Sequence, residues 1–473
     1  MNEGLIRDLR AALDPDRVRC GETELVLYGR DASNMNGSTA VVCLPLTTAE
    51  VQSCVRIANQ HSVPFVARGS GTGLAGGAVP LEGAVVIALS KMNRVLDVDT
   101  ENRLAWVEPG VLNLDLTRET TPLGLHFAPD PSSQQSCSIG GNVANNSGGP
   151  HCLADGVTNA HILGLEVVLP DGEVVLLGGE DPEPEGLDLR GVFVGSEGML
   201  GIATRICVRL SQNPPSVRTL LMDFDTVDAG AATVSAIIAA GILPAALEMM
   251  DRLCIEAVEA FVHAGLPLDA AAVLLVEVSG LAHGVESDVE RVIDIGRAHG
   301  ARTVRVAQDE AERQLLWKGR KSAFGAIARI KPNYYLHDTV VPRRRLPEVL
   351  RRVYEIAAKH DLLVLNVFHA GDGNLHPLLV FDKREPGVLE RVHAAGEEIV
   401  AVSVAAGGVL SGEHGIGLEK REYMPWMFGA DDLAAQEALR AAFDPERRSN
   451  PNKVLPSPAH CGDAHALPEG VWI

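Results

Sequence analysis

A glycine-rich run at residues 69–77 limits most strongly what this chain can fold into. An apolar stretch at 63–67 predicts a strand before the run, and residues 84–89 predict a strand after it. The glycines match the G-x-G-x-x-G dinucleotide-binding fingerprint, which requires a helix directly after the last glycine. Pro80 and the β-branched residues behind it oppose a helix at that point. We therefore exclude a Rossmann-type site and expect a long loop between two strands.

The same loop is a candidate anion site. Glycine lets backbone N–H groups approach a phosphate closely, and Arg68 and Thr72 add polar groups beside them. A flexible linker is the alternative interpretation. Upstream, an apolar run at 40–44 and a helical pattern that begins with Thr47 and Glu50 predict a β-α-β unit.

Charge and cysteine usage exclude several classes of function. The formal net charge of −21 argues against nucleic acid and anionic lipid as main partners. The 8 cysteines form no C-x-x-C pair, so we expect no iron–sulfur cluster or zinc knuckle in this chain and assign the thiols as reduced. The N-terminal residues do not resemble a signal peptide, and no run of about 18 apolar residues follows. We therefore expect a cytoplasmic location without a transmembrane segment.

Patterns along the chain predict two α+β parts. A polar segment at 128–150 contains paired glycines, and we expect an ordered binding loop there. Pro214-Pro215 predicts a domain boundary. Beyond it, strand and helix patterns alternate, and the C-terminal residues are mainly helical. A short strand is expected at 23–28.

A second candidate site comes from two apolar runs that flank Asp372-Gly373 and predict a β-hairpin. Centring the turn on these two residues pairs His369 with His376. Opposed residues lie on the same face of a sheet, with Cβ atoms about 4.5–5.5 Å apart. This arrangement suits two imidazole ligands on one metal ion.

Six segments resemble, in order, motifs of the vanillyl-alcohol-oxidase (PCMH) type of flavoprotein, and the later ones resemble its D-2-hydroxy-acid dehydrogenase branch. The segments are 64–73, 130–149, 195–202, 369–376, 411–417 and 450–453. The resemblance implies a two-lobed α+β fold. Its parts would be a PCMH-type FAD-binding domain at 1–213, an α+β, ferredoxin-like cap at 214–410, and a helical C-terminal segment at 411–473 that completes the active site.

The resemblance also implies FAD, bound by the glycine loop, the two segments that follow it and the closing motif. The expected cofactor-binding residues are Arg68, Gly69, Ser70, Gly71, Thr72, Gly73, Asp130, Ser136, Gly140, Gly141, Asn142, Asn145, Gly198, Ile202 and Asn450. Relatives with covalent FAD often attach it through a histidine in the phosphate loop. Residues 64–77 contain no histidine, so we expect non-covalent FAD.

For the second site, the resemblance adds the carboxylate of Glu413 to His369 and His376. Two histidines and one carboxylate suit Zn²⁺, Mn²⁺ or Fe²⁺, and the sequence does not choose among them. We expect His414 to be the general base, because imidazole titrates near neutral pH. Flanking glycines permit a turn that points both neighbours inward. Arg320 resembles the arginine that binds the substrate carboxylate, with a surface charge on a helix as the alternative.

The activity implied is the oxidation of a small D-2-hydroxy acid, glycolate or D-lactate, by hydride transfer from C2 to the flavin. Relatives that oxidise 2-hydroxyglutarate carry a lysine where this chain has Leu336, which disfavours a dicarboxylate substrate. The alternatives are a non-catalytic electron-relay subunit, a D-2-hydroxyglutarate-type dehydrogenase and a metal-dependent hydrolase. Electrons would leave to an iron–sulfur or second flavin subunit, a quinone or a cytochrome. A homodimer and attachment to the inner membrane through a partner stay open. The basic run at 343–345 is expected to be a solvated helix start or a docking surface for such a partner.

Overall fold

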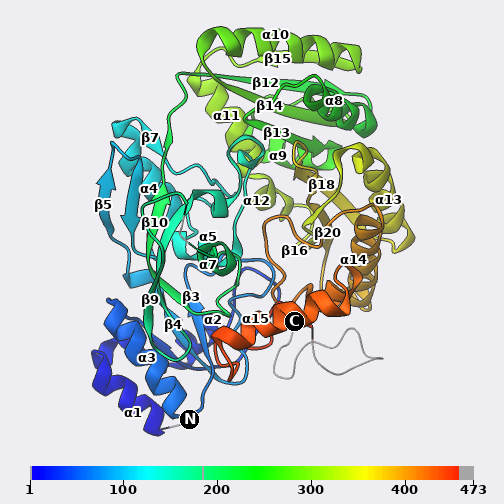
Figure 1. Cartoon of the computed structure of the whole chain (residues 1–473). Coiled ribbons are helices and arrows are strands. Elements are labelled where there is room, and N and C mark those ends of the chain that lie inside the picture. The colour runs from blue at the N-terminus through cyan, green and yellow to red at the C-terminus, as the bar shows by residue number, and fades with distance from the viewer. Residues whose placement is uncertain (1–2, 184–185, 457–473) are drawn as a thin grey trace. The chain divides into compact units, whose positions relative to one another are not determined.

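The computed structural model describes residues 3–183 and 186–456, and the chain divides into two compact units (Figure 1). Unit 1 contains residues 1–148, 156–213 and 413–473, and unit 2 contains 149–155 and 214–412. The chain passes from unit 1 to unit 2 after residue 213 and returns to unit 1 at residue 413. The excursion of 149–155 into unit 2 is a feature that the sequence did not indicate. Residues 457–473 of the expected C-terminal segment lie outside the described residues.

The first sheet of unit 1 has the order β1-β2-β4-β3, in which the last three strands are parallel. Its strands are β1 (Val18–Arg19), β2 (Thr39–Cys43), β3 (Phe65–Arg68) and β4 (Ala84–Ala88). Helix α3 (Thr48–Gln60) links β2 to β3, which confirms the expected β-α-β unit. The Thr47 hydroxyl accepts the Glu50 N–H at the start of α3, while Val51 and Val55 are buried against the sheet.

The expected strand at 23–28 is wrong, because these residues form helix α2 (Glu22–Tyr28). Leu25 and Tyr28 lie three residues apart and pack together against an apolar cluster on β2 and β4. Helical spacing therefore places both partly buried side chains on one face, whereas a strand would point them to opposite faces.

The second sheet of unit 1 is antiparallel throughout and has the order β5-β6-β10-β8-β9. Its strands are β5 (Val95–Asp99), β6 (Leu104–Val107), β8 (Ile162–Val168), β9 (Val174–Gly178) and β10 (Ile202–Arg209). A separate pair is formed by β7 (Leu125–His126) and β11 (Ser211–Gln212). The other helices of unit 1 are α1 (Glu3–Ala12), α4 (Asn113–Thr120), α5 (Ile139–Asn145), α7 (Leu189–Phe193) and α15 (Ala430–Phe443).

Unit 2 is built on one large antiparallel sheet in the order β15-β12-β14-β13-β18-β19-β17, and β20 pairs with both β18 and β16. The strands are β12 (Ser216–Phe224), β13 (Ala246–Asp251), β14 (Ala272–Gly280), β15 (Ala301–Val306), β16 (Asn333–Leu336), β17 (Thr339–Val340), β18 (Leu363–His369), β19 (Asn374–Leu375) and β20 (Pro377–Phe381). The helices are α6 (Cys152–Asp155), α8 (Val227–Ala239), α9 (Arg252–Val262), α10 (Ala282–Ala298), α11 (Glu310–Lys321), α12 (Ala323–Ile327), α13 (Leu346–Lys359) and α14 (Val388–Ala405).

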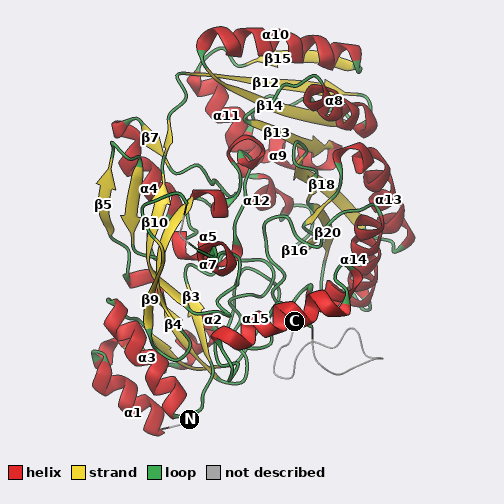
Figure 2. Cartoon of the chain, viewed as in Figure 1, coloured by secondary structure: helices red, strands yellow, loops and turns green. Residues whose placement is uncertain are grey.

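The two faces of this sheet differ in chemistry. Alternate residues of β12, β13, β14 and β18, among them Met222, Leu247, Val276 and Phe368, form one apolar core with α8, α10, α13 and α14. Figure 2 shows these helices in red beside the yellow strands. Because successive side chains in a strand point to opposite faces, the residues between them face the other way. That second face carries buried polar groups and positions the site described below.

Membrane-spanning helices and the state of the cysteines can be examined in the described part of the chain. Within residues 3–183 and 186–456, no helix combines the length and apolar character needed to cross a membrane. Seven cysteines lie in the same ranges, and all are free thiols.

Candidate active site

The glycine loop of unit 1 runs from β3 to β4 without an intervening helix, which confirms that it is not a Rossmann-type phosphate loop. Gly71 has a φ of +72°, a backbone conformation that favours glycine. A Cβ atom at this position would lie 2.2 Å from Nη2 of Arg68. The Arg68 guanidinium also lies over the Tyr28 ring, 5.4 Å from its centroid, and donates to the Arg30 carbonyl. The loop therefore folds closely around one partly buried cation.

Segments far apart in the sequence meet at this loop within unit 1. A Cβ atom on Gly69 would lie 2.2 Å from the Ser138 hydroxyl, and one on Gly77 would lie 2.9 Å from a Glu197 carboxylate oxygen. The Asn450 side chain donates to the carbonyls of Gly77, at 2.9 Å, and Glu197, at 2.6 Å. The glycine loop, the second and third resembling segments and the closing motif thus form one cradle.

Helix α5 presents part of the second segment to this cradle. The Ser138 hydroxyl caps the helix by accepting the Gly141 N–H at 3.3 Å. Gly140 packs against Pro109, because an added Cβ would lie 2.6 Å from the proline side chain, whereas Gly141 meets only Ser138. Asn142 is buried, and its side chain bonds to Asn113 and Cys137. Asn142 therefore holds α5 in place, whereas at Gly141 an added Cβ would meet only the Ser138 hydroxyl, at 3.3 Å.

Four other expected cofactor-binding residues differ in whether they lie beside the glycine loop, at the surface or in the core. Asn145 lies beside Gly73, where an added Cβ would be 3.5 Å from its side-chain nitrogen. Asp130 is buried, while Ser136 is exposed and donates to the Ser133 carbonyl at 3.2 Å. Ile202 packs into the apolar cluster under α3. The structure thus brings Asn145 to the loop, but it uses Ser136 in a surface turn and Ile202 in the core.

The remaining expected residues of the loop and of the third segment lie in the cradle or on its rim. Ser70 is exposed, and Thr72 is partly exposed. Gly198 has a φ of +75°, and an added Cβ would lie 3.9 Å from the Asn450 side chain. The Ser449 hydroxyl donates to the Gly198 carbonyl at 2.6 Å. Ser449 and Asn450, at the start of the closing motif, therefore contact Gly198 and Glu197 of the third segment.

Glu197 links the cradle to the loop that carries His414, and sequence reasoning missed it. This residue has a φ of +51° and is buried. One carboxylate oxygen accepts the N–H groups of Ile416, at 2.7 Å, and Gly417, at 3.1 Å. Burial raises the pKa of Glu197 to about 6 despite these two hydrogen bonds. The signal in the sequence is a lone acid between Gly195 and Gly198.

In unit 2, the predicted hairpin forms, but its register differs from the expected one. His369 pairs with Asn374, and Asn366 pairs with Pro377. The turn is longer than expected, because residues 370–373 lie between the paired positions, and Asp372 lacks the positive φ that the favoured two-residue hairpin turns require. The direct opposition of His369 and His376 is therefore wrong. The register changes by two residues, which keeps both histidines on one face as diagonal neighbours.

The two histidines meet the third expected ligand. Their ring centroids lie 5.0 Å apart, both side chains are buried, and one ligand atom each of His369, His376 and Glu413 lies within 4.8 Å of the others. Glu413 directly follows Gly412, the last residue of unit 2. The Nε2 atom of His414 lies 3.5 Å from Oε1 of Glu413. The next residue, Gly415, has a positive φ of +87°.

Asp338 fixes the chain that leads into Glu413. It is fully buried and accepts the Ser411 hydroxyl at 2.6 Å and the Gly412 N–H at 3.0 Å. Its Oδ1 atom also lies 3.6 Å from Nε2 of His376. One buried carboxylate therefore determines where two of the three candidate ligands can lie relative to each other.

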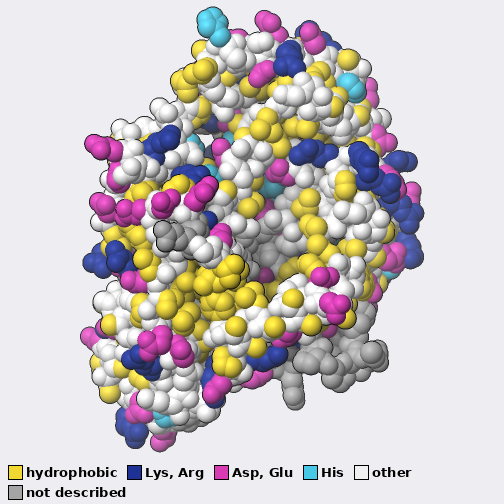
Figure 3. Space-filling model, viewed as in Figure 1, with side chains coloured by type: hydrophobic (Ala, Val, Ile, Leu, Met, Phe, Trp, Pro, Cys, Tyr) yellow, Lys and Arg dark blue, Asp and Glu magenta, His cyan; other side chains and the backbone are white. Residues whose placement is uncertain are grey.

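Arg343 belongs to the basic run that was expected to be solvated or to dock a partner. Its Nε donates to the Gly371 carbonyl at 2.5 Å, in the turn between the two histidines. Arg345 instead forms an exposed ion pair with Glu348, and on the face shown in Figure 3 Lys and Arg side chains gather over α13. The run thus begins with a residue that holds the hairpin turn.

Glu248 contacts both His369 and Arg320. Its oxygens lie 2.8 and 2.9 Å from Nδ1 of His369, and its Oε2 lies 2.6 Å from Nη2 of Arg320. Both Glu248 and Arg320 are buried, and the ion pair is not aligned as a hydrogen bond. Nε and Nη1 of Arg320 have no hydrogen-bond partner among the described residues. Arg320 is therefore a buried side chain and not the surface helix charge of the alternative interpretation.

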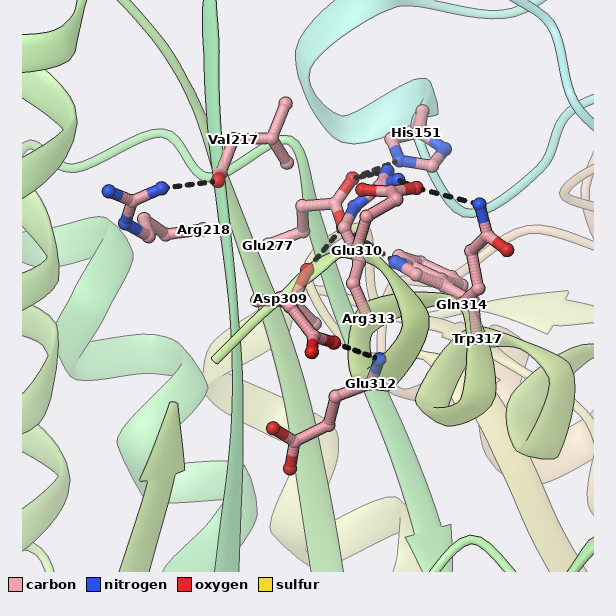
Figure 4. Close-up of polar contacts among 11 residues, drawn as sticks. His151, Val217, Arg218, Glu277, Asp309, Glu310, Glu312, Arg313, Gln314 and Trp317 are labelled. Carbon is pink, nitrogen blue, oxygen red and sulfur yellow. Dashed lines mark hydrogen bonds and ion pairs between the residues drawn. The ribbon is translucent and has the colours of Figure 1, made fainter. Parts of the chain in front are cut away.

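Helix α11 carries Arg320 and is held on the sheet by a second buried carboxylate (Figure 4). Trp317 Nε1 donates to Oε2 of Glu277 at 2.6 Å, and Arg313 donates to both Glu277 oxygens at 2.9 and 3.0 Å. His151, from the excursion segment, lies 3.2 Å from Glu277. Burial by itself raises the pKa of Glu277, but the bonds from His151 and Arg313 outweigh it and hold that pKa well below its usual range.

Models of two protein families match the chain. Residues 39–178 match the model of an FAD binding domain, and residues 213–454 match that of the C-terminal domain of FAD linked oxidases. The glycolate oxidase subunit GlcD of Escherichia coli strain K12 is 47% identical, over 94% of this chain and 90% of that one. A D-lactate dehydrogenase of Anaerostipes hadrus is 31% identical, over 93% of this chain and 95% of that one.

The fold also matches solved structures. A p-cresol methylhydroxylase with bound substrate aligns with a TM-score of 0.80 at 18% sequence identity, covering 96% of both chains. The expected α+β fold of the vanillyl-alcohol-oxidase type is thereby confirmed. The chain belongs to the family of FAD-linked oxidases.

Proposed function

We propose that this protein is an FAD- and metal-dependent dehydrogenase that oxidises glycolate or D-lactate to the 2-oxo acid. The observation that carries the proposal is the group formed by His369, His376 and Glu413, joined to the guanidinium of Arg320 through Glu248. Two buried imidazoles and a carboxylate fit a divalent cation such as Zn²⁺, Mn²⁺ or Fe²⁺. A buried guanidinium whose Nε and Nη1 atoms have no hydrogen-bond partner among the described residues fits a small carboxylate.

Arg320 would bind the substrate, and His414 would transfer the proton. Non-covalent FAD in the cradle of unit 1 supplies the acceptor for the hydride on C2. A divalent cation supplies Lewis-acid polarisation of the 2-hydroxyl group. Arg320 would hold the substrate carboxylate through Nε and Nη1, which fixes the direction of the C2–H bond. His414 would take the hydroxyl proton, because a neutral imidazole can act as a general base.

The substrate is proposed to be monocarboxylic. Leu336 is buried on β16 and supplies no charge for a second carboxylate. Two relatives support small acids, because one is named a glycolate oxidase subunit and the other a D-lactate dehydrogenase. The name of the first also supports action within an assembly. We propose that electrons leave to partner subunits that carry an iron–sulfur cluster or a second flavin.

The test is anaerobic mixing of the purified FAD-loaded protein with glycolate, D-lactate, L-lactate and D-2-hydroxyglutarate while the flavin absorbance is followed. Glycolate or D-lactate should bleach the flavin, and L-lactate should not. The His414→Ala variant should bind FAD normally but lose the bleaching. Undiminished reduction in that variant would remove His414 as the base.

The metal is tested separately by removing it with a chelator. Bleaching should stop in the metal-free protein and return when Zn²⁺ or Mn²⁺ is added. Unchanged reduction in protein shown to be metal-free would refute the metal part of the proposal and leave the flavin part standing.

A further inference from the structure

One face of the unit 2 sheet carries a row of buried polar residues. Glu248 pairs with His369 between β13 and β18, and Ala246 of the same strand pairs with Glu277. Residues paired directly across strands share a face, as do residues two apart along a strand. Glu277, Glu248 and His369 therefore lie on one face, opposite the apolar core.

Helix α11 places two arginines and a tryptophan against this row of polar residues. Arg313, Trp317 and Arg320 follow at intervals of four and three residues, so they lie on one side of the helix. The first two bind Glu277, and Arg320 binds Glu248. The helix is thus held by two carboxylates, and only one of them also contacts a candidate metal ligand.

The contact with His369 determines which ring nitrogen faces the ligand group. A carboxylate only accepts hydrogen bonds when ionised, so Glu248 requires a proton on Nδ1 of His369. Nε2 is then the nitrogen with a lone pair for a cation. Carboxylate–histidine pairs of this kind orient metal ligands, and their loss typically lowers metal affinity by about 10–100-fold.

The contact with Arg320 gives the same carboxylate a second task. A guanidinium and a divalent cation in one buried site repel each other, and a negative charge between them offsets the repulsion. Glu248 contacts the guanidinium on one side and the imidazole on the other. It leaves Nε and Nη1 of Arg320 available.

We propose that Glu248 is a positioning residue that holds the metal ligand His369 and the carboxylate-binding Arg320 in one arrangement. The inference rests on the proposed function for the role of Arg320, whereas the role toward His369 requires only that a cation binds. Metal binding and recognition of the substrate carboxylate are therefore coupled through one side chain.

The first test is Glu248→Gln, with metal affinity as the readout. Arginine has no acceptor, so the glutamine oxygen should turn to Arg320 and its NH₂ group to Nδ1 of His369. That contact favours the tautomer with a proton on Nε2, which removes the lone pair. We expect the Kd for Zn²⁺, measured on the FAD-loaded, metal-stripped protein by competition with a chromophoric chelator, to rise about 10–100-fold.

The matched control is Glu277→Gln, which removes the other buried carboxylate that holds α11 on the same sheet face. It should leave the Zn²⁺ affinity within about threefold of the wild type, because Glu277 bonds to Thr219, Arg313, Trp317 and His151, and none of these is a candidate metal ligand. Equal weakening in both variants would show a general loss of structure and overturn the inference. Unchanged Zn²⁺ affinity in Glu248→Gln would overturn it as well.

The second test separates the two tasks. Arg320→Met keeps the contact between Glu248 and His369, so Zn²⁺ affinity should stay near that of the wild type while the KM for glycolate rises about tenfold or more. Glu248→Gln should show a raised glycolate KM even at saturating Zn²⁺. A KM that returns fully to the wild-type value on adding metal would refute the coupling.

Because removing Glu248 alone leaves a buried cation, Glu248→Gln is also combined with Arg320→Met. The double variant should fold at least as well and still bind Zn²⁺ more weakly than Arg320→Met alone. In the wild type, ¹⁵N spectra of the Zn²⁺-loaded protein should show a proton on Nδ1 of His369, and metal on Nδ1 would refute the inference without any variant. If Zn²⁺ binds and depends on Glu248 but no 2-hydroxy acid is oxidised, the proposed function alone fails; a wild type that binds no cation overturns both.

Discussion

Replacing Glu197 with glutamine should make the protein more stable above neutral pH. The buried carboxylate holds the N–H groups of Ile416 and Gly417 with one oxygen, and a glutamine oxygen accepts the same two bonds. The other oxygen has no partner among the described residues. Glutamine therefore keeps the contacts that hold the His414 loop and removes only a buried charge.

The size of the effect follows from the pKa of Glu197, which burial raises from 4.5 to about 6. A difference of roughly 1.5 pKa units corresponds to about 2 kcal/mol. The folded state binds the proton more tightly than the unfolded state, so the contribution of Glu197 to stability is complete below pH 4.5 and is lost as the pH rises through about 6. At about pH 8 the variant should exceed the wild type by up to about 2 kcal/mol, or roughly 4–8 °C in Tm.

The assay is the Tm of both FAD-loaded proteins by calorimetry between about pH 4.5 and pH 8. The difference should be near zero at the acid end and grow with pH. Glu197→Ala is the control that removes the buried charge and both bonds, and it should be less stable than Glu197→Gln at every pH by about 1–3 kcal/mol. A Tm difference between Glu197→Gln and the wild type that does not change with pH would refute the reasoning.

Three other changes give separate tests. Glu277→Gln should destabilise the protein at neutral pH by about 1–3 kcal/mol, because Arg313 and His151 lose their counter-charge; calorimetry at falling pH should show the difference shrinking as the wild-type carboxylate is protonated. Gly71→Ala should reduce the FAD content of the purified protein about tenfold, whereas Gly124→Ala, at a φ of +79° but with open space around it, should not; equal FAD content in both would contradict the cradle. Leu336→Lys should raise kcat/KM for D-2-hydroxyglutarate relative to glycolate about tenfold in stopped-flow flavin reduction, and an unchanged ratio would remove this position as a determinant of specificity.

Local patterns were sufficient for much of unit 1 and failed where burial came from elsewhere. The β-α-β unit around α3 was predictable, because the cap and the apolar spacing lie within the helix and the residue before it. The helix at 22–28 was not, because Leu25 and Tyr28 find their apolar neighbours on β2 and β4. The excursion of 149–155 depends on the contact of His151 with Glu277, 126 residues away, which no local pattern encodes.

In the candidate site, the proposed metal ligands could be predicted from the sequence, whereas the groups that hold them could not. His369 and His376 could be selected because they flank one turn, and the two-residue error in register did not matter. A strand repeats every two residues, so an even shift exchanges partners but keeps each side chain on its face. A shift of one residue would have placed the two histidines on opposite faces of the sheet, and the prediction that both bind one metal ion would then have been wrong.

The roles of Glu248, Asp338 and Glu197 could not be predicted from a local pattern in the sequence. Glu248 reaches His369 across 121 residues, Asp338 reaches Gly412 across 74, and Glu197 reaches Ile416 across 219. Each is a single acid in an apolar or glycine-rich stretch, and its task is visible only when the pairing of distant strands is known. Such residues cost free energy to bury unless they are bonded, so a lone acid inside a predicted buried strand is itself a signal. Glu248 in β13 and Glu277 in β14 both meet that description, and both turn out to hold the helix that carries Arg320.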